Sequence, residues 1–193
     1  MRGEMATTQR LGLHAHVSLG RAIAILAIPL LLGACLPTTV STYTLETYTS
    51  ADGRFHVDVP GGAMADTIIP SGGVFAASTV HGLTVTADKL RFAVVYGDAQ
   101  PGYLAATPID TALENAVAGN VTSTHGTLVE QHPITVAGSP AREARISIVG
   151  AEYLFVVTFV GNRLYSLSVL GTSDSAVRGS EATQFLTSFA VSP

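Results

Sequence analysis

The chain has 193 residues, and only 12% of them are charged, about half of the roughly 25% that is usual in globular proteins. Three arginines and one glutamate lie in the first 34 residues, which leaves 7 basic and 13 acidic residues and a net charge of −6 in the remainder. This acidic balance, with no basic patch, excludes a typical nucleic-acid-binding protein, and the length favours one domain with a sizeable core.

The N-terminal segment has the pattern of a secretory signal peptide. Three arginines precede an uncharged apolar run at residues 22–32, and the small residues Gly33 and Ala34 follow it. The run is shorter than the about 20 apolar residues that a transmembrane helix needs, and it contains Pro29. A positive region, a short apolar run and small residues before a cleavage point predict export from the cytoplasm.

Cys35, the only cysteine of the chain, follows directly, and the sequence LGAC at residues 32–35 resembles the lipobox of bacterial lipoproteins. The resemblance implies that residues 1–34 are a lipoprotein signal peptide. It also implies that Cys35 is the lipid attachment site, where two or three acyl chains such as palmitate hold the protein on a membrane. Leu36 stands where an Asp favours inner-membrane retention, so the outer membrane is favoured, on the periplasmic side of the cell envelope. An ordinary signal peptide and a buried apolar segment are the alternatives.

Residues 35–42 lack hydrophobic periodicity and are interpreted as a lipidated tether, and residues 43–193 as a single α+β domain. The domain begins with an imperfectly alternating stretch. Residues 50–53, SADG, predict a turn. Residues 54–59, RFHVDV, alternate apolar and polar side chains, as a half-buried strand does.

Two loops and a hairpin are predicted next. Residues 61–73 have glycines at both ends and two adjacent isoleucines, which either cover a pocket, meet a partner or pack back on the sheet; packing is favoured. The alternating runs 83–88 and 90–98 are joined by a tight link and predict a hairpin. Residues 97–107 break the strand pattern and form the second predicted loop.

Helical spacing of apolar residues begins at Ile109 and predicts a helix. Thr107 is its predicted N-cap, Pro108 suits the first helical position, and Asp110 interacts favourably with the first turn. Gly119 is the predicted C-terminal stop.

Strands are then expected on both sides of Pro133, after Pro140, and in residues 153–160 and 163–170, which a two-residue hairpin turn joins. The first member of that hairpin is apolar almost throughout, so it is predicted to be a central strand that is covered on both faces.

A final helix is expected from about Ser175 to Ser188, with Asp174 as its cap and with Gly179 weakening it by about 1 kcal/mol relative to Ala. The order of elements predicts an α+β fold, a mostly antiparallel β-sheet with two packed helices.

Three segments together resemble the PsbP-like α/β/α sandwich of many small exported bacterial proteins. They are DGRFHVDVP at 52–60, GSPARE at 138–143, and GNRLYSLSVLG at 161–171 followed by FLTSF at 185–189. The resemblance covers about residues 43–191 and implies the fold. Members of the fold act as binding or assembly factors, but fold analogy does not transfer function. No ligand residue maps onto a motif of this sequence, so the ligand-binding residues are unknown.

Metal chemistry has little support in the sequence. Four histidines follow the predicted tether, and none has the spacing of a zinc site, so a metal would need ligands from distant strands. No metal site and no cofactor are expected. The alternative is a carrier of a metal or small ligand that uses His56, His81, His125 or His132.

No catalytic residue is predicted either. Asp52 and Asp58 are close in sequence and could act as an acid–base pair, as in glycosidases. SADG is better explained as a turn, however, and Asp58 is expected to point away from the core. The motif G-x-S-x-G is absent, and the Ser and Asp of residues 171–175 are interpreted as helix-capping residues. Four aromatic residues at strand spacing are expected in the core: Tyr153, Phe155, Phe159 and Tyr165.

These observations favour a membrane-anchored periplasmic lipoprotein that acts as a non-catalytic binding or assembly module. Its expected partners are the membrane, through the lipid anchor, and an unidentified envelope protein or small ligand, with no nucleic acid. A small envelope hydrolase is a further alternative, and it requires clustered polar groups with perturbed pKa values in a pocket.

Overall fold

The computed structural model describes residues 43–50, 52, 54–70, 73–75 and 79–192. The predicted signal peptide, the predicted lipid attachment site Cys35 and the predicted tether lie outside the described residues. None of the helices in the described ranges combines the length and the hydropathy that crossing a bilayer requires.

The described residues form two antiparallel sheets. The larger sheet has seven strands in the order β3-β4-β5-β9-β8-β7-β6, and the smaller has three in the order β1-β2-β10. The strands are β1 (Leu45–Thr49), β2 (Phe55–Pro60), β3 (Ala65–Ile69), β4 (Val80–Ala87), β5 (Leu90–Asp98), β6 (Thr127–Val136), β7 (Ser139–Ile148), β8 (Ala151–Val160), β9 (Arg163–Gly171) and β10 (Ala190–Val191). The helices are η1 (Gly73–Phe75), α1 (Tyr103–Ala106), α2 (Ile109–Thr124), α3 (Asp174–Val177) and α4 (Ser180–Ser188).

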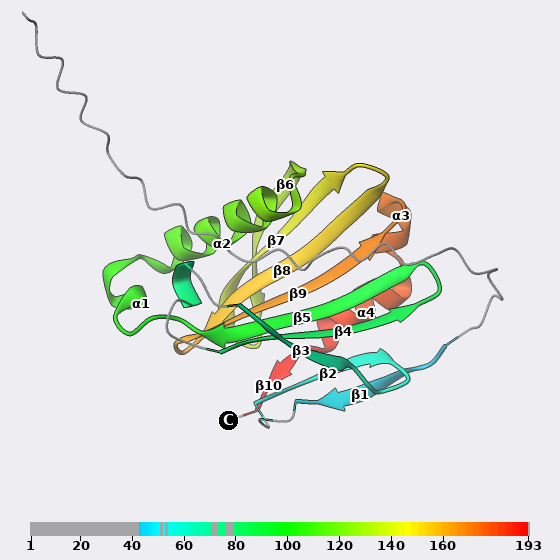
Figure 1. The fold of residues 1–193 in the computed structure, drawn as a ribbon, viewed down its shortest axis with the longest axis horizontal. Coiled ribbons are helices and arrows are strands. Elements are labelled where there is room, and N and C mark those ends of the chain that lie inside the picture. The colour runs from blue at the N-terminus through cyan, green and yellow to red at the C-terminus, as the bar shows by residue number, and fades with distance from the viewer. Residues whose placement is uncertain (1–42, 51, 53, 71–72, 76–78, 193) are drawn as a thin grey trace, which may run out of the picture.

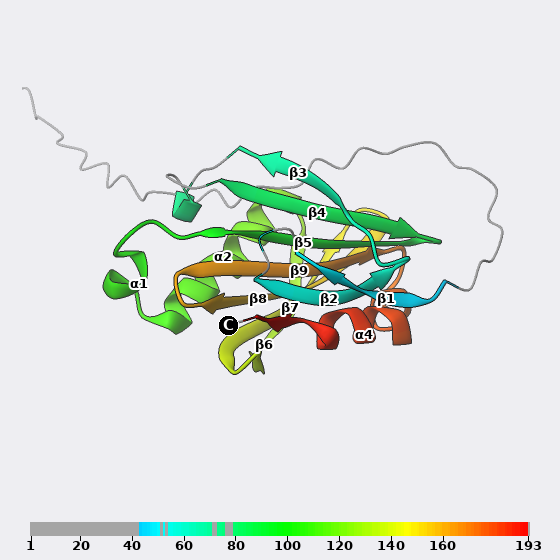
Figure 2. The ribbon, with the colours of Figure 1, turned by 90° about the horizontal axis from the view of Figure 1, so that it is seen from below.

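The larger sheet is the middle layer of the molecule. Helix α2 lies across one face, against β7 and β8, and the smaller sheet and α4 lie on the opposite face (Figures 1 and 2). Each face therefore has its own buried core. Leu113 and Phe155 belong to the core under α2, and Phe55 and Phe185 belong to the core under the smaller sheet and α4.

The predicted α+β class and the central position of residues 153–160 are confirmed. Strand β8 lies between β7 and β9, and six of its consecutive residues are buried, because both faces of the sheet are covered at this point. The turn after it has Gly161 at φ 60°, the left-handed conformation that a tight hairpin turn requires and that glycine adopts without strain.

The predicted ends of the helix at Ile109 were wrong. The helix continues to Thr124, and Gly119 is buried inside it rather than ending it. Packing of the last turns against the sheet outweighs the cost of about 1 kcal/mol for a glycine in a helix. His125, at φ 53°, is the C-cap instead, and at the other end Thr107 ends α1 and provides no side-chain cap for α2.

The predicted final helix is interrupted. Helix α3 ends at Val177, and α4 begins after Gly179, whose extended backbone serves as its N-cap. The cap of α3 is Ser173, whose hydroxyl accepts a hydrogen bond from the Ala176 N–H, so Asp174 is the first helical residue and not the cap.

Both predicted loops contain secondary structure. Residues 61–73 include the edge strand β3, and residues 97–107 include the short helix α1. The two strands expected around Pro133 are one strand, β6, which tolerates the proline because it lies at the edge of the sheet. The smaller sheet was not predicted, since it forms only when β1 and β10 pair with the two sides of β2.

Candidate ligand-binding pocket

A pocket of about 480 Å³ opens where β4 and β9 begin and β5 ends. We call it the strand-end pocket. Its lining consists of Asp52, Thr79, His81, Tyr96, residues 97–101, Asn162 and Arg163. The second predicted loop thus contributes to the pocket, whereas the residues described as lining it include none from 61–73. Within 61–73, Ile69 packs in the core as predicted and Ile68 is exposed.

Arg163, which lines the strand-end pocket, forms ion pairs with two carboxylates. It is paired directly with Asp98 across β5 and β9, and its Nε and Nη2 donate to the two Asp98 oxygens at 2.7 and 3.1 Å. Its Nη1 donates to Oδ2 of Asp52 at 2.5 Å. All three guanidinium nitrogens therefore have a carboxylate partner, which fixes the side chain in one orientation.

The turn before β2 positions Asp52 for this contact. The Ser50 hydroxyl and the Arg54 backbone N–H both donate to Oδ1 of Asp52, as the turn predicted from SADG implies. The other oxygen, Oδ2, remains available for Arg163. The same carboxylate thus stabilises a local turn and connects the smaller sheet to the end of the larger one.

These contacts keep the carboxylates ionised. The hydrogen bonds and charge of Arg163 lower the pKa of Asp98. Desolvation tends to raise the pKa of Asp52, but hydrogen bonds from Ser50, Arg54 and Arg163 outweigh it, so that the pKa of Asp52 is also lowered. The hydrogen bonds to Asp98, which have the larger effect, and to Asp52 raise the pKa of Arg163. All three groups are therefore charged at neutral pH.

A row of side chains crosses four strands beside these charges. Ile68, His81, Tyr96 and Tyr165 are successive cross-strand partners on β3, β4, β5 and β9, so they lie on one face of the sheet. Their exposure falls from 69% for Ile68 to 4% for Tyr96 and 1% for Tyr165. The row therefore leads from the free edge of the sheet into the core, and Tyr165 is a core residue as predicted.

Tyr96 is the link between this row and the ion pairs. The His81 ring stacks on it with 4.9 Å between centroids and 7° between planes, and the Arg163 guanidinium carbon lies 5.5 Å from its centroid. Phe55 of β2 packs edge-on at 5.4 Å. Burial raises the pKa of the Tyr96 hydroxyl. On the exposed side, Nδ1 of His81 lies 3.2 Å from a carboxylate oxygen of Asp66.

The four histidines that the carrier hypothesis invokes do not form one site in the described ranges. His56, His81, His125 and His132 lie on β2, on β4, after α2 and on β6. No three His, Cys, Asp or Glu side chains in the described parts of the chain are placed to hold a metal ion. Nε2 of His132 lies 3.2 Å from Glu143 on the neighbouring strand.

Asp58, the other member of the sequence pair, serves a different part of the fold. Its carboxylate accepts hydrogen bonds from Thr47 of β1 at 2.9 Å and from Gln184 of α4 at 3.2 Å, so it joins the smaller sheet to the helix beside it. Asp52 instead has Asp98 as its carboxylate neighbour. The pairing suggested by sequence proximity is therefore replaced by one between distant residues.

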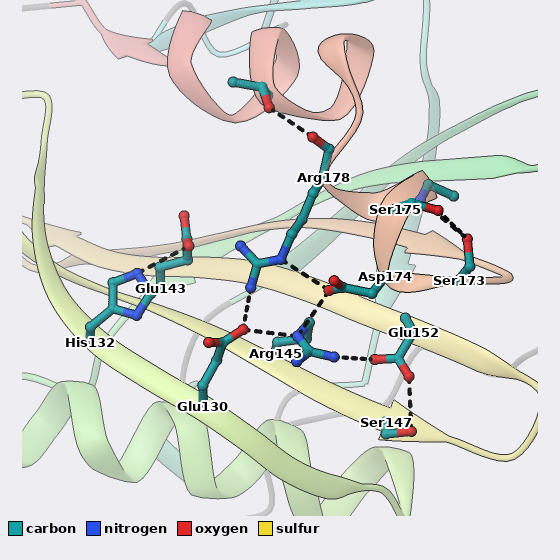
Figure 3. A network of polar contacts seen from close by, with 12 residues as sticks. Glu130, His132, Glu143, Arg145, Ser147, Glu152, Ser173, Asp174, Ser175 and Arg178 are labelled. Atoms are coloured by element: carbon teal, nitrogen blue, oxygen red, sulfur yellow. Dashed lines mark hydrogen bonds and ion pairs between the residues drawn. The ribbon is translucent and has the colours of Figure 1, made fainter.

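A second polar network surrounds Arg145 of β7, and we call it the Arg145 cluster (Figure 3). Arg145 contacts Glu130 of β6 at 2.9 Å, Glu152 of β8 at 3.0 Å and Asp174 of α3 at 3.1 Å. Arg178 bonds both Glu130 and Asp174. Because the contacts join three strands to the α3 region, the Arg145 cluster is a structural brace between the sheet and the C-terminal helices.

Sequence reasoning missed Asp98 and Arg163. Both stand where a hydrophobic strand pattern ends or begins, Asp98 at the end of 90–98 and Arg163 directly after the Gly161-Asn162 turn. Correct pairing of the two strands would have placed them opposite each other. Asp52 was considered only for catalysis and for the turn, because its partner lies 111 positions away.

No family model matches the sequence, and no curated protein matches it. In three dimensions the chain is similar to cyanobacterial PsbP (CyanoP) from Synechocystis sp. PCC 6803, with a TM-score of 0.55 and 13% identity over 83% of this chain and 99% of that one. The PsbP-like fold expected from the sequence is therefore confirmed, and at this identity the likeness shows the fold alone.

Two further structures are more distant. A Pseudomonas aeruginosa protein of unknown function, PA94, described as a putative regulator, gives a TM-score of 0.34 and 10% identity over 69% of this chain and 86% of that one. A Bacteroides thetaiotaomicron protein gives a TM-score of 0.39 and 11% identity over 76% of this chain and 48% of that one. These TM-scores are too low to support an argument.

Proposed function

We propose that this protein is a lipid-anchored, extracytoplasmic binding module whose strand-end pocket receives a ligand or partner segment and carries out no catalysis. The observation that carries the proposal is that the charged groups of the pocket are ionised and paired with one another. Arg163 is bonded through each of its nitrogens, and both carboxylates are engaged with it. Such a pocket presents a preorganised surface for binding.

The same observation argues against a hydrolase that uses these two carboxylates as its acid and base. A pair of carboxylates that acts as acid and base needs one member with a raised pKa, so that it still holds a proton at neutral pH. Here the pKa values of Asp52 and Asp98 are both lowered, and a guanidinium lies between the two groups. Neither carboxyl is suited to protonate a leaving group.

The anchor part of the proposal comes from the sequence. A basic segment, a short apolar run and small residues lead to the single cysteine, Cys35, and only eight positions separate this cysteine from Tyr43. Two or three acyl chains at Cys35 would hold the domain near a bilayer with little freedom to diffuse away. A binding module in this position would act on molecules of the cell envelope.

The test is acylation and membrane retention of the full chain expressed in a bacterium. Cells are grown with an alkyne analogue of palmitate, and the protein is detected after coupling to a fluorophore and after separation of membrane and soluble fractions. We expect labelled protein in the membrane fraction and, for Cys35→Ser, loss of both the label and membrane retention. An unlabelled protein with an intact leader would refute the proposal.

The binding part is tested separately with a photoreactive amino acid at Thr79, which lines the strand-end pocket, and at Val149, a fully exposed control position on the turn between β7 and β8. We expect a discrete adduct from Thr79 that Arg163→Met diminishes, and none from Val149. Equal adducts from both positions would show that the pocket has no binding role.

A further inference from the structure

The two edges of the larger sheet differ in how they are protected. Strand β6 carries Pro133 in its middle and an irregularity between Leu128 and Glu130, and both features hinder the addition of another strand. Strand β3, with the sequence ADTII, pairs with β4 in regular register and has neither feature. Four of its five residues are exposed, and no strand among the described residues pairs with its outer edge, so that this edge is a template for a further strand.

The β3 edge also presents an apolar side chain beside the strand-end pocket. Ile68 is 69% exposed, the highest value among the isoleucines and leucines described as exposed. It is the cross-strand partner of His81, which lines the pocket, so both side chains lie on the pocket face of the sheet. An added strand would place an apolar side chain opposite Ile68 on that face.

The charges around this edge are acidic. Asp66, two residues before Ile68, lies on the same face and contacts His81 at 3.2 Å. Asp52 and Asp98 lie further inside the pocket, and Arg163 and Arg54 are the cations near them. Among the carboxylates and guanidinium groups named here, three negative charges stand against two positive ones. Asp52 and Asp98 are both paired with Arg163, whereas Asp66 lies on β3 itself. Asp66 is therefore the carboxylate that a strand added to this edge would face.

We infer that the β3 edge binds an extended polypeptide segment that adds an eighth strand to the larger sheet. The segment carries a lysine or arginine opposite Asp66 and an apolar residue opposite Ile68, two positions apart, so that both side chains lie on the pocket face. Backbone hydrogen bonds to β3 provide affinity, and the two side chains provide selectivity. This inference rests on the proposed binding function and names its partner class.

The probe is an acetylated and amidated threonine hexapeptide with lysine and valine two positions apart, prepared in both orders. Amide hydrogen exchange of the full chain in detergent is followed by mass spectrometry. We expect the peptide to slow exchange of residues 65–69 and to leave the β6 edge, residues 127–136, unchanged. Replacing its lysine by glutamate weakens binding about fivefold or more, because an opposite-charge pair becomes a like-charge pair. N-methylation of alternate amides removes the protection.

The protein variants are Ile68→Lys and, as a matched control on the other edge, Val129→Lys. Both side chains are exposed, so both variants should keep the wild-type melting temperature. Ile68→Lys should weaken binding of the lysine peptide about fivefold or more, and Val129→Lys should leave it unchanged.

Three results would overturn the inference: no protection of residues 65–69 at millimolar peptide, protection that survives N-methylation, or protection that depends only on protein concentration, which would indicate pairing between two copies. Acylation of Cys35 does not enter this experiment. An acylated protein without peptide protection would therefore refute the inference alone, and a protected protein without acylation would refute the proposed anchor alone.

Discussion

Replacing Arg163 by Met should destabilise the domain at neutral pH and should cost little in acid. The substitution keeps much of the side-chain volume and removes the charge that Asp52 and Asp98 share. The Arg163 side chain is only 12% exposed, whereas the side chains of Asp52 and Asp98 are 33% and 46% exposed. The interaction therefore falls between an exposed ion pair, worth about 0–1 kcal/mol, and a buried pair, whose disruption costs about 3–5 kcal/mol. We expect a loss of about 2 kcal/mol at pH 7.

The pH dependence follows from the direction of the pKa shifts. Both aspartates have lowered pKa values in the folded state, so their contribution is present above the unfolded-state pKa of about 3.9 and is lost as the pH falls through the folded-state values. Wild type should thus lose stability below about pH 4 faster than Arg163→Met does. The cost of the substitution should shrink toward zero once both carboxyls are protonated.

Urea denaturation of wild type and Arg163→Met at pH 7 and at pH 3 or below measures this difference, and thermal melting should show a shift of about 4–8 °C at pH 7. Lys89→Met, an exposed cation on the β4–β5 turn, is the control and should change little. A cost at pH 7 below about 0.5 kcal/mol, the range of ordinary surface substitutions, would refute the reasoning, and so would an equal cost in acid.

Three other substitutions test individual contacts of the fold. Phe55→Ala should destabilise by about 3–5 kcal/mol in urea denaturation, because the side chain is fully buried against Tyr96, whereas Val149→Ala on an exposed turn should be neutral. Gly126→Ala should lower the melting temperature, since its Cβ would lie only 2.2 Å from a methyl group of Ile146; an unchanged value would mean that this contact relaxes freely. Arg145→Ala should lower the melting temperature more than Arg178→Ala, because Arg145 is less exposed and contacts three carboxylates; the reverse order would disprove its bracing role.

The parts of the fold that were predicted correctly depend on short stretches of sequence. The β8–β9 hairpin follows from two apolar runs and a Gly-Asn turn, and the strand at 54–59 follows from alternation. Strand β3 was missed because an edge strand with four exposed residues has no alternation to detect. The length of α2 was misjudged because a buried glycine is tolerated once the helix packs on a sheet.

The strand-end pocket was beyond sequence reasoning for a different reason. Its ion pairs join a turn near residue 52 to strand ends at 98 and 163, and nothing local indicates which charges will meet. In the sequence, the histidines are candidate metal ligands and Asp52 and Asp58 are a candidate acid–base pair, because of their residue types alone. The structure instead connects the carboxylates to an arginine that belonged to no motif.

The smaller sheet has a consequence for the order of events during biosynthesis. Strand β2 pairs on one side with β1 and on the other with β10, which contains residues 190–191. Phe189, just before β10, packs against Phe55 of β2 in the core. Strand β2 therefore has both of its strand neighbours only after residues 190–191 have emerged from the ribosome. Until then β2 has only β1 as a strand neighbour, and Phe55 lacks its aromatic contact with Phe189.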